Sequence, residues 1–208
     1  MKSTGHPSAL RRAVCILAAG LALATVSTPS MAAALDGPIP GAPPGDRTSP
    51  ILQETYPFFA TWVDLAASGY VEEEFYLSGA ADAYDGQGNL LAGAVPYRTR
   101  IVVRRPQLPK DFNGTVLMEW QNVTAGYDLD ALWHPTHVLR AGYVWVGVSA
   151  QRVGVNQLRG WSPTRYGDLD VTDGGTYMGD ELSYEIFAQA AAAVRAASGG
   201  DTRGGLEV

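Results

Sequence analysis

The chain has 208 residues, of which 46% are hydrophobic and 17% are charged, so it can bury the core of one globular domain. This composition excludes a disordered chain and a coiled coil. A formal net charge of −6 gives no basic stripe to neutralise phosphates, which argues against nucleic acid as a partner.

Residues 1–34 have the pattern of a secretory signal peptide: a basic start, an apolar stretch at 13–26 and small residues at 30–34. An uncleaved membrane anchor is the alternative, but the apolar stretch is shorter than the ~20 residues that a span needs. The single cysteine, Cys15, lies in this leader, so the remainder must fold without disulfides although it is exported. We expect a secreted or periplasmic protein that has no membrane contact after cleavage.

Residues 35–50 are dense in Pro and Gly and are interpreted as a linker to a folded body at 51–208. Two strands are predicted at 70–77 and 97–104, joined through a turn cluster at 85–89.

Residues 115–120 and 143–149 are apolar on both faces, which is typical of parallel strands covered by helices. Between them, Pro135 suits a first helical position and Gly142 can end the helix, giving a strand–helix–strand unit. The segment 152–165 is interpreted as a loop. A long helix is predicted at 180–197 with Asp180 as its cap.

The order of these elements resembles the N-terminal half of an α/β hydrolase. The amino-acid sequence of several segments is similar to that of secreted bacterial α/β-hydrolase-domain proteins. The segments that carry the resemblance are 112–115, 119–123, 142–154, 166–167 and 183–190. It implies an α/β fold with a mostly parallel sheet and helices on both faces. The resemblance also implies hydrolysis of a small-molecule ester or acyl substrate by a Ser-His-acid triad.

The nucleophile of such a triad stands in a G-x-S-x-G turn, and the sequence contains no such motif. Ser149 follows a predicted strand, but Gln151 stands where the tight turn needs a glycine. A further strand is expected to begin at 204–208. We therefore expect the domain to be truncated before the nucleophile elbow, with the triad beyond Val208, and the 208 residues alone to be inactive.

The loop after 115–120 offers the backbone N–H of Asn122 or Val123 to a developing oxyanion. The alternative for Asn122 is an ordinary turn cap. Candidate substrate-binding residues, again conditional on the resemblance, lie beyond the next strand: Gln151, Arg152, Trp161 and Tyr166. These aromatic residues could instead form a lid that packs on the body, and Arg152 could simply pair with a nearby Asp.

No cofactor or metal is expected, because the sequence has no phosphate loop and no Cys or Glu near His134 and His137 to complete a zinc site. These histidines are interpreted as structural or surface residues. The aspartates at 168–173 are interpreted as a solvated turn, with a loose calcium site as the alternative. A second hypothesis is a non-catalytic secreted domain that binds a ligand or partner. The sequence leaves the oligomeric state open.

Overall fold

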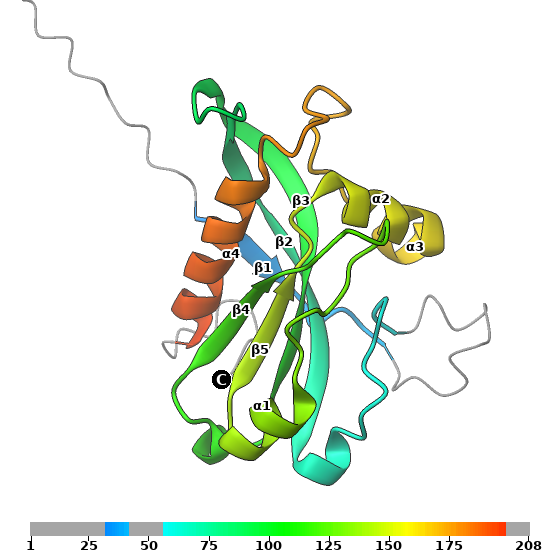
Figure 1. The fold of residues 1–208 in the computed structure, drawn as a ribbon, viewed down its shortest axis with the longest axis vertical. Coiled ribbons are helices and arrows are strands. Elements are labelled where there is room, and N and C mark those ends of the chain that lie inside the picture. The colour runs from blue at the N-terminus through cyan, green and yellow to red at the C-terminus, as the bar shows by residue number, and fades with distance from the viewer. Residues whose placement is uncertain (1–31, 42–55, 199–208) are drawn as a thin grey trace, which may run out of the picture.

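The computed structural model describes residues 32–41 and 56–198. Its strands form one sheet in the order β1-β2-β3-β5-β4, as Figure 1 shows. The strands are β1 (Ala34–Asp36), β2 (Tyr70–Tyr84), β3 (Leu90–Pro106), β4 (Val116–Trp120) and β5 (Val144–Val148).

The hairpin of β2 and β3 confirms the predicted strands and turn, with both strands longer than expected. Asp85 fixes the turn, because its Oδ1 accepts hydrogen bonds from the N–H groups of Gln87 (2.9 Å) and Asn89 (2.8 Å). Strands joined by such a short turn must run antiparallel.

The expectation of a mostly parallel sheet is wrong. Only β4 and β5 pair in parallel, whereas β1–β2, β2–β3 and β3–β5 are antiparallel. The apolar strands β4 and β5 do form the predicted parallel pair, but the long hairpin contributes most of the sheet. The fold class therefore remains α/β, with a mixed and mainly antiparallel sheet.

Helices pack on both faces of the sheet. Helix α4 (Ser183–Ser198) buries Ile186, Ala190 and Val194 in the larger core, together with the side chains of β5 at 144, 146 and 148. Helix α1 (Pro135–Ala141) buries Val138 against Trp145, which points to the opposite face because side chains alternate along a strand. As predicted, α1 begins at Pro135 and ends at Gly142.

Two short helices occupy the segment interpreted as a loop: α2 (Arg152–Trp161) and α3 (Pro163–Tyr166). Gly154 and Gly160 obscured the helical pattern, although Val155 and Leu158 are buried at helical spacing. Ser162 starts α3 by accepting a hydrogen bond from the Arg165 N–H. The 3₁₀ turns η2 (Ala66–Ser68) and η3 (Pro109–Asp111) complete the described elements.

The described part of the predicted linker is bound to the sheet and is not a free tether. β1 pairs with β2, and the Ile39 N–H donates to Glu74 O at 2.7 Å. Proline and glycine do not prevent a short edge strand, because an edge needs hydrogen bonds on one side only. Most of the predicted leader (1–31), the rest of the linker and the expected strand start at 204–208 lie outside the described residues.

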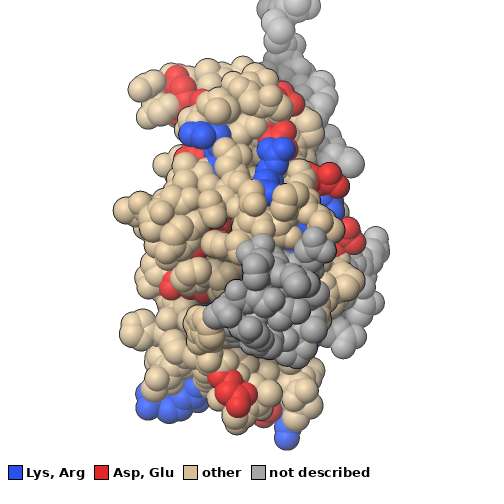
Figure 2. Space-filling model, turned by 90° about the vertical axis from the view of Figure 1, so that its right-hand side faces the viewer, with Lys and Arg blue, Asp and Glu red and all other residues tan. Residues whose placement is uncertain are grey.

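On the face shown in Figure 2, Lys and Arg side chains stand in small separate groups with Asp and Glu nearby. Within residues 32–41 and 56–198, the helices are all too short or too polar to cross a membrane.

Candidate active site at one edge of the sheet

The parallel pair β4 and β5 directs two loops to the same edge of the sheet. Residues 121–130 leave the carboxyl end of β4, and residues 149–152 leave the carboxyl end of β5. In α/β sheets, ligands bind in the crevice beyond these carboxyl ends. Four of the candidate residues, Asn122, Val123, Gln151 and Arg152, therefore lie together at this edge.

The loop after β4 is closed by a backbone pair between Asn122 and Leu129. The Asn122 N–H donates to Leu129 O at 3.2 Å, and the Leu129 N–H donates to Asn122 O at 2.9 Å. The Asn122 side chain accepts a hydrogen bond from the Thr124 N–H, so it caps the turn. The Val123 N–H, by contrast, has no hydrogen-bond partner among the described residues, which leaves it available to an oxygen of a ligand.

Ser149 is fully buried and belongs to a polar network. Its Oγ lies 2.5 Å from Asp128 Oδ2 and 3.1 Å from Gln121 Oε1, and it accepts a hydrogen bond from Arg100 Nε at 3.1 Å. Its carbonyl oxygen accepts a hydrogen bond from the Thr99 hydroxyl. Ser149 has no exposed surface and, among the described residues, no histidine hydrogen-bonded to it, so it is not placed to attack a substrate as the serine of a Ser-His-acid triad does.

The two described histidines lie at the other end of β5. The His137 ring contacts Tyr143, which immediately precedes β5, whereas Ser149 immediately follows that strand. His134 and His137 are both exposed at the start of α1. Among the described residues, no hydrogen bond joins Ser149 to either histidine.

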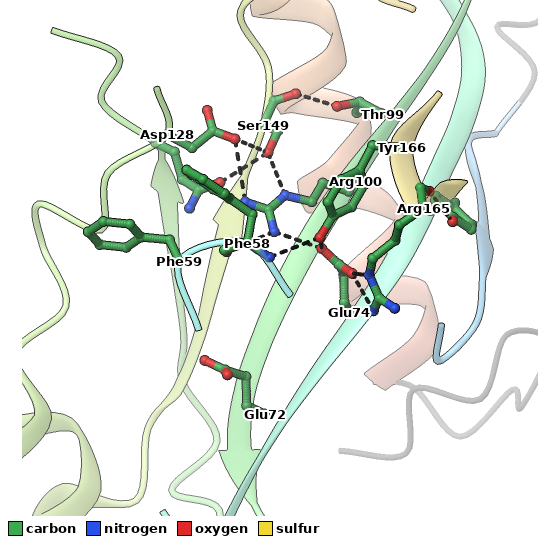
Figure 3. A network of polar contacts seen from close by, with 12 residues as sticks. Phe58, Phe59, Glu72, Glu74, Thr99, Arg100, Asp128, Ser149, Arg165 and Tyr166 are labelled. Atoms are coloured by element: carbon green, nitrogen blue, oxygen red, sulfur yellow. Dashed lines mark hydrogen bonds and ion pairs between the residues drawn. The ribbon is translucent and has the colours of Figure 1, made fainter. Parts of the chain in front are cut away.

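The network around Ser149 continues across the sheet through buried charges (Figure 3). Arg100 donates through Nη1 to Glu74 Oε1 at 2.7 Å, and Glu74 Oε1 also accepts from the Tyr166 hydroxyl at 2.7 Å. Glu74 Oε2 pairs with Arg165 Nη2 at 2.6 Å. Arg100 Nη2 lies 3.5 Å from Asp128 Oδ2.

A second buried arginine stands four residues further along β3. Arg104 pairs with Glu72 through Nε at 2.6 Å and with Asp130 through Nη2 at 2.7 Å. Its guanidinium lies over the rings of Trp133 and Trp145, at 4.6 and 4.4 Å from their centroids. Arg100 and Arg104 lie on the same face of β3, because residues an even number apart share a face.

Burial perturbs two titratable groups of this network. It raises the pKa of Asp128 above that of an ordinary carboxyl group, against the opposing effects of the Arg100 charge and the Ser149 hydrogen bond. Consistent with that direction, Asp128 Oδ1 has no hydrogen-bond partner in the described structure. Burial and the negative charge of Glu74 raise the pKa of the Tyr166 hydroxyl, which stays protonated and donates.

Gln151 and Arg152 lie at the candidate edge, where Asp180 holds them. The Trp120 indole N–H donates to Gln151 Oε1 at 2.9 Å, and Gln151 Nε2 donates to Asp180 Oδ2 at 2.9 Å. The other oxygen of Asp180 accepts the Arg152 N–H at 2.9 Å. The predicted cap of α4 therefore contacts the start of α2 instead, and α4 begins at Ser183.

The two aromatic candidates lie further along α2 and α3, away from the Gln151 side chain. Tyr166 is fully buried, and its hydroxyl also accepts the Phe58 N–H at 2.9 Å. Trp161 is half-buried and packs edge-on against Phe58 and Tyr56. In this arrangement both residues contact the segment at 56–58.

A groove of about 750 Å³ lies elsewhere, between the segment after β1 and strand β2. Its walls include Pro38, Ile39, Trp62, Leu65 and Tyr70. Its position on the opposite side of β3 from β4 means that it does not contain the Val123 N–H. No group of three or more metal-binding side chains was found in the described parts of the chain.

The sequence analysis missed the buried residues Glu74, Arg100, Arg104 and Asp128. One signal was available, because Arg100 and Arg104 alternate with the apolar residues of a strand and the acidic run at 72–74 lies on its hairpin partner. Such a register places opposite charges next to each other across a hairpin. The pairing with Asp128 and Asp130 depends on the course of the loop and had no sequence signal.

Comparison with known proteins identifies the family. Residues 35–208 match the model of a family described as alpha/beta hydrolase domain. No curated protein and no solved structure matches the chain. The family model spans most of the chain and includes both loops of the candidate edge, so the chain belongs to the alpha/beta hydrolase domain family.

Proposed function

We propose that the chain forms the oxyanion-binding side of a secreted carboxylic-ester hydrolase of the Ser-His-acid type, acting on small-molecule ester or acyl substrates. The observation that carries this proposal is the unpartnered Val123 N–H in the loop that follows β4. Asn122 contributes less as a donor, because its N–H is bound to Leu129.

A backbone N–H at this position can stabilise the transition state of ester hydrolysis. When a nucleophile attacks the ester carbonyl, negative charge develops on the carbonyl oxygen, and a fixed N–H stabilises this charge more than it stabilises the neutral substrate. Removing one such donor typically lowers kcat by roughly 10²- to 10³-fold.

The nucleophile, the acid and the histidine of the proposed triad come from outside the described residues. This part of the proposal is supported by the burial of Ser149 and by the separation of the histidines from it along β5.

The test compares two substitutions at Val123 in the protein produced from its native gene. Val123→Pro removes the backbone N–H that would donate to the oxyanion. Val123→Ala is the matched control, because it keeps the N–H. With p-nitrophenyl acetate and butyrate, we expect Val123→Pro to lower kcat by roughly 10²-fold or more with little change in KM.

Equal kcat values for the proline and alanine variants would remove Val123 from the mechanism. A wild-type protein that hydrolyses no ester would refute the proposed function. The second candidate, a non-catalytic ligand- or partner-binding domain, would then take its place. It is favoured by the same burial of Ser149.

A further inference from the structure

Two buried arginines of β3 each contact the same two segments of the chain. Arg100 donates to the carbonyl oxygen of Phe58 at 3.1 Å and lies 3.5 Å from the carboxylate of Asp128. Arg104 donates to the carbonyl oxygen of Phe59 at 3.5 Å and pairs with Asp130 at 2.7 Å. Each arginine therefore links one backbone carbonyl of the 58–59 segment to one carboxylate of the loop after β4.

The two segments also contact each other. The Tyr127 ring lies 6.0 Å from the Phe58 ring and 5.9 Å from the Phe59 ring, measured between centroids. Phe59 has a φ of 61°, which is costly for a bulky residue and persists only where its surroundings fix it. The arginine contacts to Phe58 and Phe59 supply that constraint.

Buried ion pairs rarely add much net stability, because the cost of removing both charges from water offsets their attraction. What they add in suitable cases is a single defined geometry. Here Asp128 and Asp130 flank Leu129, whose backbone closes the loop on Asn122. Gln121 Nε2 adds a hydrogen bond to Asp130 Oδ1 at 2.9 Å, so both ends of the loop are bound to the same charged cluster.

We propose that Arg100 and Arg104, with Asp128 and Asp130, are positioning residues that hold the loop at 122–129 in the one conformation that presents the Val123 N–H. None of the four is a catalytic residue, since they act on the reaction only through the loop. The expected effect on kcat rests on the proposed ester hydrolysis. The expected effect on the conformation of the loop does not.

The decisive variant is Asp130→Asn, which keeps the side-chain volume and removes the charge that pairs with Arg104. The matched control is Glu73→Gln, which breaks the Glu73–Arg105 ion pair of the same hairpin, 2.8 Å long and partly exposed. Asp128→Asn is a second variant, which reports on the Arg100 pair should Asp130→Asn fail to fold.

Two readouts are measured on the protein produced from its native gene. We expect amide hydrogen exchange in the peptide covering 122–129 to speed up by about tenfold or more in Asp130→Asn, with exchange in β2 and β3 unchanged. We expect kcat for p-nitrophenyl acetate to fall by about 10- to 100-fold with KM within about twofold, because misplacing a donor weakens transition-state binding more than substrate binding. Glu73→Gln should change neither quantity.

Unchanged exchange in the loop, or exchange that rises equally throughout the protein, would overturn the proposal. A loosened loop with an unchanged kcat would also overturn it. A wild-type protein without esterase activity would instead refute the proposed function. The exchange measurement would still decide whether the charged cluster fixes the loop.

Discussion

Gly154 in helix α2 lies directly against the buried carboxylate of Asp128. A Cβ atom added at Gly154 would stand 1.9 Å from Asp128 Oδ1 and 2.7 Å from its Cγ, far inside van der Waals contact. In Gly154→Ala the carboxylate must therefore move, although it is 1% exposed and bound to Ser149 and Arg100.

The loss of unfolding free energy in Gly154→Ala can be estimated from the contacts with Ser149 and Arg100 that the displaced Asp128 carboxylate gives up. A buried charge that loses its partners costs about 3 to 5 kcal/mol, and partial relaxation of the site places the expected loss near 3 kcal/mol. Alanine is a better helix former than glycine by up to about 1 kcal/mol, which offsets part of the loss. We expect Gly154→Ala to lower the free energy of unfolding by about 2 kcal/mol.

Gly160 of the same helix supplies the control, because nothing lies within 4 Å of a Cβ added there. Gly160→Ala should gain up to about 1 kcal/mol from helix propensity alone. Urea denaturation of both variants measures the difference, expected near 3 kcal/mol with Gly154→Ala the less stable. Equal stability of the two variants would refute the packing of Asp128 against α2.

Three other outcomes are expected. Because burial raises the pKa of Asp128 in the folded state, its contribution to stability is largest below the ordinary carboxyl pKa of about 3.9 and is lost as the pH rises through the folded value. The stability cost of Asp128→Asn should accordingly shrink between about pH 4 and pH 7, and a cost that grows over this range would contradict the direction of the shift. Tyr166→Phe removes one of the hydrogen bonds that Glu74 Oε1 accepts and leaves the Phe58 N–H without a partner, so urea denaturation should show a loss of about 1.5 to 3 kcal/mol, and no loss would exclude these hydrogen bonds. Finally, the signal peptide predicted from the sequence ends at Ala34, whereas Ala34 pairs with Ser78 in β1, so we expect any cleavage to follow Ala32; N-terminal sequencing of the protein from its native source decides between Ala33 and Leu35 as the first residue.

The sequence predicted those parts of the fold that depend on local pattern. The turn at Asp85, the start of α1 at Pro135, its end at Gly142 and the apolar face of α4 all follow from neighbouring residues. At Gly142 the reason is explicit: φ is 73°, and a Cβ would meet the carbonyl oxygen of Asp111 at 2.4 Å.

Features that depend on distant contacts were not predictable in the same way. Helix α2 has two glycines and a weak local signal, and it is stabilised by burying Val155 and Leu158 in the core. Asp180 has the residue type of a helix cap, but its carboxylate binds Gln151 and the Arg152 N–H, 29 and 28 residues away in sequence. Tertiary contacts decided both cases.

In the candidate site, too, some features were predictable from the local sequence and others depend on distant contacts. Resemblance and position after β4 indicated the backbone N–H of Asn122 or of Val123, and only the pairing of the Asn122 N–H with Leu129 in the structure separates the two. The buried charges that hold this loop come from four separate segments, and the register of one hairpin accounts only for the pair of Glu72 with Arg104.

The most direct test of the proposed ester hydrolase is to label the protein from its native source with a fluorophosphonate, which reacts with activated serines, and to map the labelled residue by mass spectrometry. We expect stoichiometric labelling of one serine that is not among the residues described. A label on Ser149 would contradict the account of a buried structural serine, and the absence of any label would contradict the serine hydrolase itself.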